Sequence, residues 1–227
     1  YLDNNRVVVS FEGKTLTVDA SKVWLMKNKK KRYASTIEVM PTRPYRYRSP
    51  ITVVPTRYRY GAVVGNFNAM LNTEMKDSMV AMFNDNHDQF LEADPKGPLF
   101  NCVRTHMAGG GNASCRPWQM TKDAIGMPTG PYTSLTHLYR DSDGVMKTAQ
   151  HFICVAFNRI VDLFLENPSK TTLYYSVNTY DPPDSKRLGL GIFSGQVGED
   201  VIEFITAHME KLPMMVEHKR KTGKYYM

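Results

Sequence analysis

Basic charge is concentrated in one segment of this chain, residues 27–60. The segment holds ten Lys or Arg and one acid, Glu38, so its formal charge is +9, whereas the whole chain of 227 residues carries +7. The other 193 residues therefore carry −2. Five of the cations fall within residues 27–32, and they repel one another too strongly to be buried without an anionic partner. The sequence therefore predicts an arm on the surface of the fold.

A short repeat lies inside this arm. Arg alternates with Tyr in residues 43–48 and again in residues 57–60, and each run follows a Pro-Thr pair. Four prolines between residues 41 and 55 remove backbone donors, so any strand formed here is restricted to a sheet edge or an extended arm. Residues 37–40 and 51–54 could each form one such short strand.

The arm has the composition of a surface that binds polyanions. Guanidinium groups pair with phosphates and tyrosine rings stack on exposed bases. We therefore expect it to contact RNA, or as the alternative an acidic partner subunit, through the Lys, Arg and Tyr side chains that it presents. These are Lys29, Lys30, Lys31, Arg32, Arg43, Tyr45, Arg46, Tyr47, Arg48, Arg57, Tyr58, Arg59 and Tyr60.

The remainder of the chain has the patterns of a mixed fold. Apolar residues recur at helical spacing in residues 67–91, 152–166 and 197–212, whereas residues 171–177 have the pattern of a strand. Hairpins are indicated at residues 6–18 and 132–148 by turn residues between β-branched or aromatic runs. We expect an α/β fold, with α+β as the alternative, in which about three helices pack on a mixed sheet.

Four regions follow from these patterns. Residues 1–26 form an N-terminal β-hairpin region and residues 27–60 the basic arm. Residues 61–216 form a single α/β core, within which residues 95–131 show no clear periodicity. Residues 217–227 form a basic C-terminal tail.

The cysteines and the first residue indicate in which cellular compartment the protein resides. Cys102, Cys115 and Cys154 form neither a disulfide framework nor a zinc spacing, and no apolar run approaches the roughly 18 residues that span a bilayer. We expect a soluble protein of a reducing intracellular compartment. A mitochondrial location follows if Tyr1 is a processed end, and a viral polyprotein product is the alternative.

No group of residues indicates a reaction. Residues 106–115 are rich in glycine but fit neither known phosphate-binding motif, so a plain loop is favoured over a phosphate loop. Cys115 with His106 is a candidate nucleophile and base that nothing in the sequence brings together. The histidines near acids, His87 and His137, lack the spacing of metal ligands. We therefore expect no metal, no cofactor and no catalytic residue.

Three segments are similar to the strand-and-loop order of ADP-ribose-binding macro domains. They are residues 62–68 (AVVGNFN), a late strand from Thr171, and residues 189–195 (GLGIFSG) before a helix. The resemblance spans about half the chain, and the expected methionine-lined helix stands where a Gly-rich loop would follow Asn68. It implies that the loop of Gly191, Ile192 and Phe193 cradles phosphate, and that Asn66 or Asn68 faces the ribose.

These observations favour a non-catalytic structural subunit of a larger intracellular assembly, a nucleoprotein or organellar complex, that contacts RNA or an acidic subunit through the arm. One alternative is an enzyme or sensor for a nucleotide-like or ADP-ribose-like ligand. Another is a viral coat or nucleoprotein unit.

Overall fold

The computed structural model describes residues 6–11, 14–19, 51–94, 107–190 and 196–226. The chain divides into two compact units, Tyr1–Arg46 and Tyr47–Met227. In the first unit, strand β1 (Arg6–Phe11) pairs with strand β2 (Lys14–Asp19) in antiparallel register. The predicted opening hairpin is therefore confirmed.

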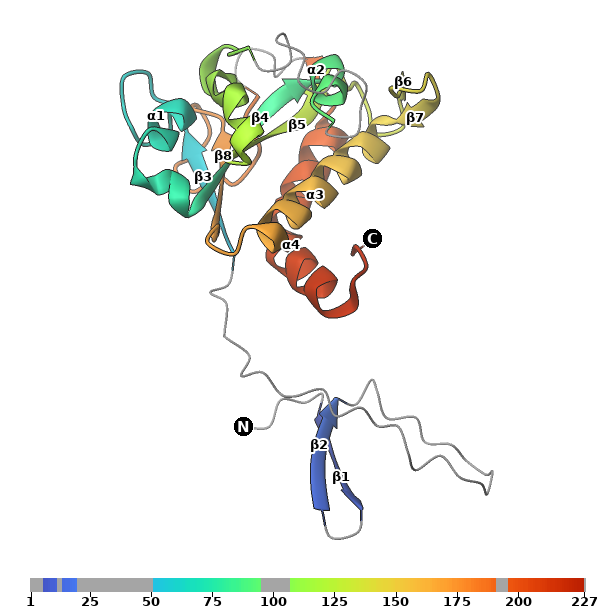
Figure 1. Cartoon of the computed structure of the whole chain (residues 1–227). Helices are drawn as coiled ribbons and strands as arrows, with labels where there is room; N and C mark the ends of the chain where they lie inside the picture. The colour runs from blue at the N-terminus through green and yellow to red at the C-terminus, as the bar shows by residue number, and fades with distance from the viewer. Residues whose placement is uncertain (1–5, 12–13, 20–50, 95–106, 191–195, 227) are drawn as a thin grey trace. The chain divides into compact units, whose positions relative to one another are not determined.

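The second unit is built on a parallel sheet of four strands. The strands are β3 (Thr52–Arg57), β4 (Met79–Asn86), β5 (Ala124–Gly130) and β8 (Thr172–Val177). Their order in the sheet is β3-β8-β4-β5, and every pair is parallel, with the carboxyl ends at the upper edge in Figure 1. The predicted α/β fold and the strand near residues 171–177 are confirmed. Antiparallel pairing occurs in separate hairpins.

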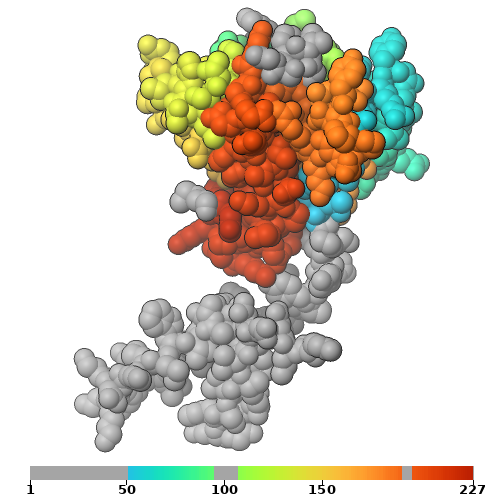
Figure 2. Space-filling model, turned by 180° about the vertical axis from the view of Figure 1, so that it is seen from behind, coloured from blue at the N-terminus to red at the C-terminus, as the bar shows by residue number. Residues whose placement is uncertain are grey.

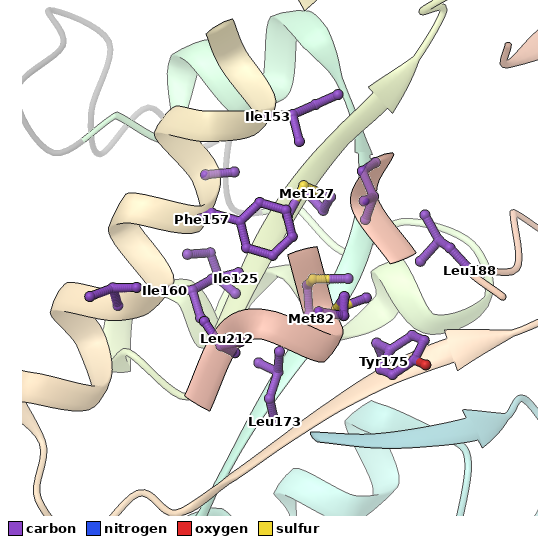
Figure 3. Packing of buried hydrophobic residues seen from close by; sticks show 14 of the residues in the cluster. Met82, Ile125, Met127, Ile153, Phe157, Ile160, Leu173, Tyr175, Leu188 and Leu212 are labelled. Carbon is purple, nitrogen blue, oxygen red and sulfur yellow. The ribbon is translucent and has the colours of Figure 1, made fainter. Parts of the chain in front are cut away.

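Helical segments cover both faces of this sheet. Helices α3 (Ala149–Glu166) and α4 (Glu199–Thr222) pack on one face, and Figure 3 shows Phe157 of α3 directed toward the strands. Helix α1 (Phe67–Leu71) and the 3-10 helix η4 (Gly111–Thr121) pack on the other face, and the 3-10 helix η2 (Glu74–Asp77) follows α1.

Strand β4 divides its side chains between the two cores. Val80 and Met82 belong to the core beneath α3 and α4, whereas Met79, Ala81 and Phe83 belong to the core beneath α1 and η4. Five successive residues are therefore buried. A strand buried on both faces has a continuous apolar sequence rather than an alternating one.

The helix predicted for residues 67–91 is wrong for this reason. The helix ends at Leu71, β4 occupies Met79–Asn86, and a short helix α2 (His87–Glu92) follows. Short apolar runs do not distinguish a buried strand from a helix by periodicity, and the methionines suited either pattern.

Three further segments differ from the expected boundaries. The short edge strand expected at residues 51–54 is confirmed as β3, which continues to Arg57 at a sheet edge, where Pro55 can be accommodated. Strand β5 lies inside the segment predicted to be irregular. Helix α4, in red in Figure 2, continues past Pro213 to Thr222 and takes in the start of the expected tail.

Three other predicted elements are confirmed, whereas the short strand expected at residues 37–40 lies outside the described residues. Helices occupy most of residues 152–166 and 197–212, and β6 (Leu138–Arg140) pairs with β7 (Met146–Thr148) across the predicted turn. Among the described residues, no helix is long and apolar enough to cross a membrane.

Candidate functional site at the carboxyl edge of the parallel sheet

The strand order makes β8 a switch point. Strands β3 and β4 lie on either side of β8. Strand β3 leads to α1 on one face and β4 leads through the short helix α2 to η4 on that face, whereas β8 itself leads to α4 on the opposite face. In open parallel sheets, ligands bind outside the carboxyl ends of strands where neighbouring connections leave to opposite faces. The carboxyl end of β8 is therefore where a ligand site is expected.

Asn112 joins two of the segments that meet at this edge. Its Nδ2 donates to Ser176 Oγ of β8 at 2.7 Å, and its Oδ1 accepts from Phe67 N at the start of α1 at 2.9 Å. One side-chain amide at the start of η4 thus fixes the loop after β3 relative to the end of β8.

Asn84 joins β4 to the segment that follows β8. Its Nδ2 donates to Gly189 O at 2.7 Å, while Gly189 N donates to Ser176 O at 2.9 Å. A Cβ at position 189 would lie 2.2 Å from Asn178 N. Glycine is required there because the two backbone segments pack directly against each other.

The glycines of the edge fall into two kinds. Gly65, with φ +93°, is tightly packed, because a Cβ there would lie 1.9 Å from Arg57 O. Gly110 and Gly111 instead face open space among the described residues, since a Cβ at either position would have no described atom within 4 Å. Gly110 caps the N-terminus of η4 without a side-chain hydrogen bond, and the first backbone N–H groups of a helix have no partner within the helix.

A buried ion pair lies beneath the glycine loop. Arg116 NH2 lies 2.8 Å from Asp85 Oδ1, and the side chains are 7% and 0% exposed. Arg116 also donates to Gln89 Oε1 and to Met107 O, each at 2.9 Å. Burial raises the pKa of Asp85 even though the Arg116 guanidinium opposes that shift.

Two buried polar atoms of this pair and one of the neighbouring Gln119 are unsatisfied among the described residues. Asp85 Oδ2, Arg116 Nε and Gln119 Nε2 have no hydrogen-bond partner within the part of the chain that is described. Each such atom costs about 1–3 kcal/mol of stability. Gly126 lies between two of these residues, since its N donates to Gln119 Oε1 and a Cβ there would lie 2.8 Å from Asp85 Oδ2.

His87 is a packing residue of the fold. Its Nε2 donates to the carbonyl of Arg140, which can only accept, at 2.8 Å, and its Nδ1 is hydrogen-bonded to Tyr132 Oη at 2.8 Å. The ring also makes an edge contact with Phe152. Among the described residues, no group of three or more His, Cys, Asp or Glu side chains could hold a metal ion.

The Cys115 thiol is not activated. It is fully buried in the core beneath α1 and η4, and burial raises its pKa. A thiol becomes nucleophilic through a lowered pKa and access to solvent. His106, the base considered for it, lies outside the described residues.

Both asparagines expected to face a ribose have side-chain hydrogen bonds within the fold. Asn66 Oδ1 accepts from Ala69 N as the cap of α1, and Asn68 Oδ1 accepts from Trp118 Nε1 at 3.0 Å. The expected phosphate loop, Gly191, Ile192 and Phe193, lies outside the described residues.

Of the residues expected to form the basic arm, some are described by the structure and the others are not. Arg57 donates to the carbonyls of Thr179, Asp181 and Pro182, which closes β3 onto the loop after β8. Arg59 and Tyr60 are exposed and Tyr58 is half-buried. The rest lie outside the described residues: Lys29, Lys30, Lys31, Arg32, Arg43, Tyr45, Arg46, Tyr47 and Arg48.

Asn84, Asp85, Asn112 and Arg116 were not among the predicted site residues. The available signal was that Asn112 follows three consecutive glycines and that polar residues 84–86 end an apolar run, as at the carboxyl end of a buried strand. No family model, curated protein or solved structure matches this chain.

Proposed function

We propose that this chain binds a nucleotide-like ligand with phosphate groups, such as ADP-ribose, at the carboxyl edge of its parallel sheet. The observation that carries the proposal is the linkage of three glycine-bearing segments around the end of β8. They are held together by Asn112 and Asn84 through bonds to Phe67 N, Ser176 Oγ and Gly189 O.

The exposed glycines suit phosphate recognition. Without side chains, Gly110 and Gly111 let an anion approach the backbone N–H groups at the start of η4, and the helix dipole favours negative charge there. The tightly packed Gly65 and Gly189 have a different role, because they hold the neighbouring segments in place.

A bulky side chain at Gly110 tests this directly. Gly110 has φ −77° and faces open space, so Gly110→Val fits the fold but covers the start of η4. We expect calorimetry with ADP-ribose, ADP and AMP to show affinity that falls about tenfold or more in the variant, with an unchanged unfolding temperature.

The control is Gly144→Asn in the turn of the β6–β7 hairpin. Gly144 has φ +80° and also faces open space, and asparagine tolerates this conformation. The Gly144→Asn variant should bind the three nucleotides with the affinity of the wild type. Absence of binding by the wild type at millimolar ligand, or equal binding by Gly110→Val, would reject the proposal.

We also propose a second function, binding of RNA by the basic arm, and it is supported by the local charge of +9 in residues 27–60. An acidic protein subunit is the competing partner. Because the guanidinium of Arg57 already donates to backbone carbonyls, we assign the RNA contacts to the other basic side chains of the arm. RNA would then be contacted by the basic side chains of the arm that precede β3 and by Arg59, which follows it.

The test is RNA affinity against salt concentration for the wild type and for a variant with Arg43, Arg46, Arg48 and Arg59 changed to Ala. Each lost phosphate contact should reduce the slope of log affinity against log salt by about 0.7. Arg57→Ala is the contrasting variant, expected to lower stability rather than the slope. An unaltered slope in the fourfold variant would favour a protein partner.

A further inference from the structure

The side chain of Arg116 connects three parts of the molecule beneath the carboxyl edge. Its guanidinium bonds to Asp85 at the end of β4, to Gln89 of α2 and to the backbone carbonyl of Met107. Two of these partners belong to regular elements, whereas Met107 begins the glycine loop. The guanidinium therefore ties that loop to the sheet.

The loop backbone rests directly on this group. A Cβ at Gly109 would lie 3.1 Å from both terminal nitrogens of Arg116 and 2.8 Å from Ala113 Cβ. Gly109 N is bonded to Ala113 O at 2.9 Å, whereas the next two glycines face open space. Arg116 thus holds one side of the loop, and within the described part of the chain no atom covers the other side at Gly110 and Gly111.

Stability alone is a weak reason for such an ion pair. Removing two charges from water costs about as much as their attraction returns, so buried pairs seldom stabilise a fold over apolar packing. Here Asp85 Oδ2 and Arg116 Nε are also unsatisfied within the described residues. What the pair supplies is geometry, because a planar guanidinium fixes several acceptors in defined directions.

We propose that Arg116, anchored by Asp85, is a positioning residue that holds residues 107–111 in the arrangement required to bind the phosphate of the ligand. This inference rests on the proposed nucleotide-like ligand. Arg116 is buried beneath the loop and acts on phosphate through the backbone that it holds.

The test is Arg116→Lys, which keeps the charge but offers one nitrogen in place of a planar fork. Amide hydrogen exchange at residues 109–112 should accelerate about tenfold, because the loop loses its tie to β4 and α2. The affinity ratio of ADP to adenosine should fall about tenfold, since adenosine lacks the phosphate. A purely structural role would lower both affinities equally and leave the ratio unchanged.

The matched control is Arg159→Lys. Arg159 is a partly buried arginine of α3 that pairs with Asp94 at 3.2 Å and lies over the Phe90 ring, and both of these partners lie outside the glycine loop. Its variant should leave loop exchange and the ADP-to-adenosine ratio unaltered. If Arg116→Lys fails to fold, Gln89→Met removes one anchor of the guanidinium and should act in the same direction with a smaller effect.

The outcomes separate this inference from the function on which it rests. Wild-type protein that binds no phosphate-bearing ligand rejects the proposed function, and positioning for phosphate is rejected with it. If the wild type binds ADP but Arg116→Lys leaves the ADP-to-adenosine affinity ratio or the hydrogen exchange of the loop unchanged, only the proposed role of Arg116 is rejected.

Discussion

At the scale of single residues, Asp85 is subject to opposing effects. Burial disfavours its charged form, while Arg116 at 2.8 Å favours it, and Glu92 adds a smaller repulsion. Burial is the largest of these effects and raises the pKa of Asp85 above its usual 3.8. The folded chain therefore holds the Asp85 proton more tightly than the unfolded chain.

This shift predicts how stability depends on pH. As pH rises above 3.8, the unfolded chain releases the Asp85 proton first, so the contribution of Asp85 to the free energy of unfolding falls until the folded-state pKa is passed. Asp85→Asn removes this titration. We expect the stability of the wild type relative to the variant to decrease with rising pH, measured by urea unfolding between about pH 3.5 and 7.

The comparison has a clear contrary result. A wild-type stability that rises relative to Asp85→Asn over this range would mean that the attraction of Arg116 dominates over burial.

At the scale of elements, β4 decides the architecture. Its side chains supply both cores, and its carboxyl end carries Asn84 and Asp85 to the candidate site. A strand in this position must be apolar on both sides, which is why its sequence resembles that of a helix. Methionine suits it because a flexible, unbranched side chain fills irregular spaces.

Methionines in different elements should therefore differ in their effect on stability. Met82 of β4 is 1% exposed and Met214 of α4 is 58% exposed. We expect Met82→Ala to lower the free energy of unfolding by about 2–5 kcal/mol through the cavity that it leaves. Met214→Ala should change it by less than about 0.5 kcal/mol. Urea unfolding measures both, and similar losses would contradict the assignment of β4 to the core.

At the scale of the whole molecule, the two proposed functions use different parts of the chain. The nucleotide-like ligand is assigned to the carboxyl edge of the second unit, whereas most of the basic residues precede β3. The arginine variant designed for RNA binding should therefore retain ADP-ribose affinity, and Gly110→Val should retain RNA affinity. Loss of both activities in either variant would mean that one surface serves both.

Local patterns determined a large part of this fold. Helices α3 and α4, strand β8 and the hairpins were predictable because each has a periodicity or turn composition that its own residues carry. The concentration of charge in residues 27–60 is likewise a property of the sequence alone.

Only the tertiary structure showed that β4 and β5 are strands and which residues meet at the candidate site. Whether residues 79–83 form a helix or a strand depends on burial from both faces, which residues far away in the chain provide. Asn112 meets Ser176 across 64 positions and Arg116 meets Asp85 across 31. Such pairings arise from strand order, and no local pattern specifies which strand lies beside β8.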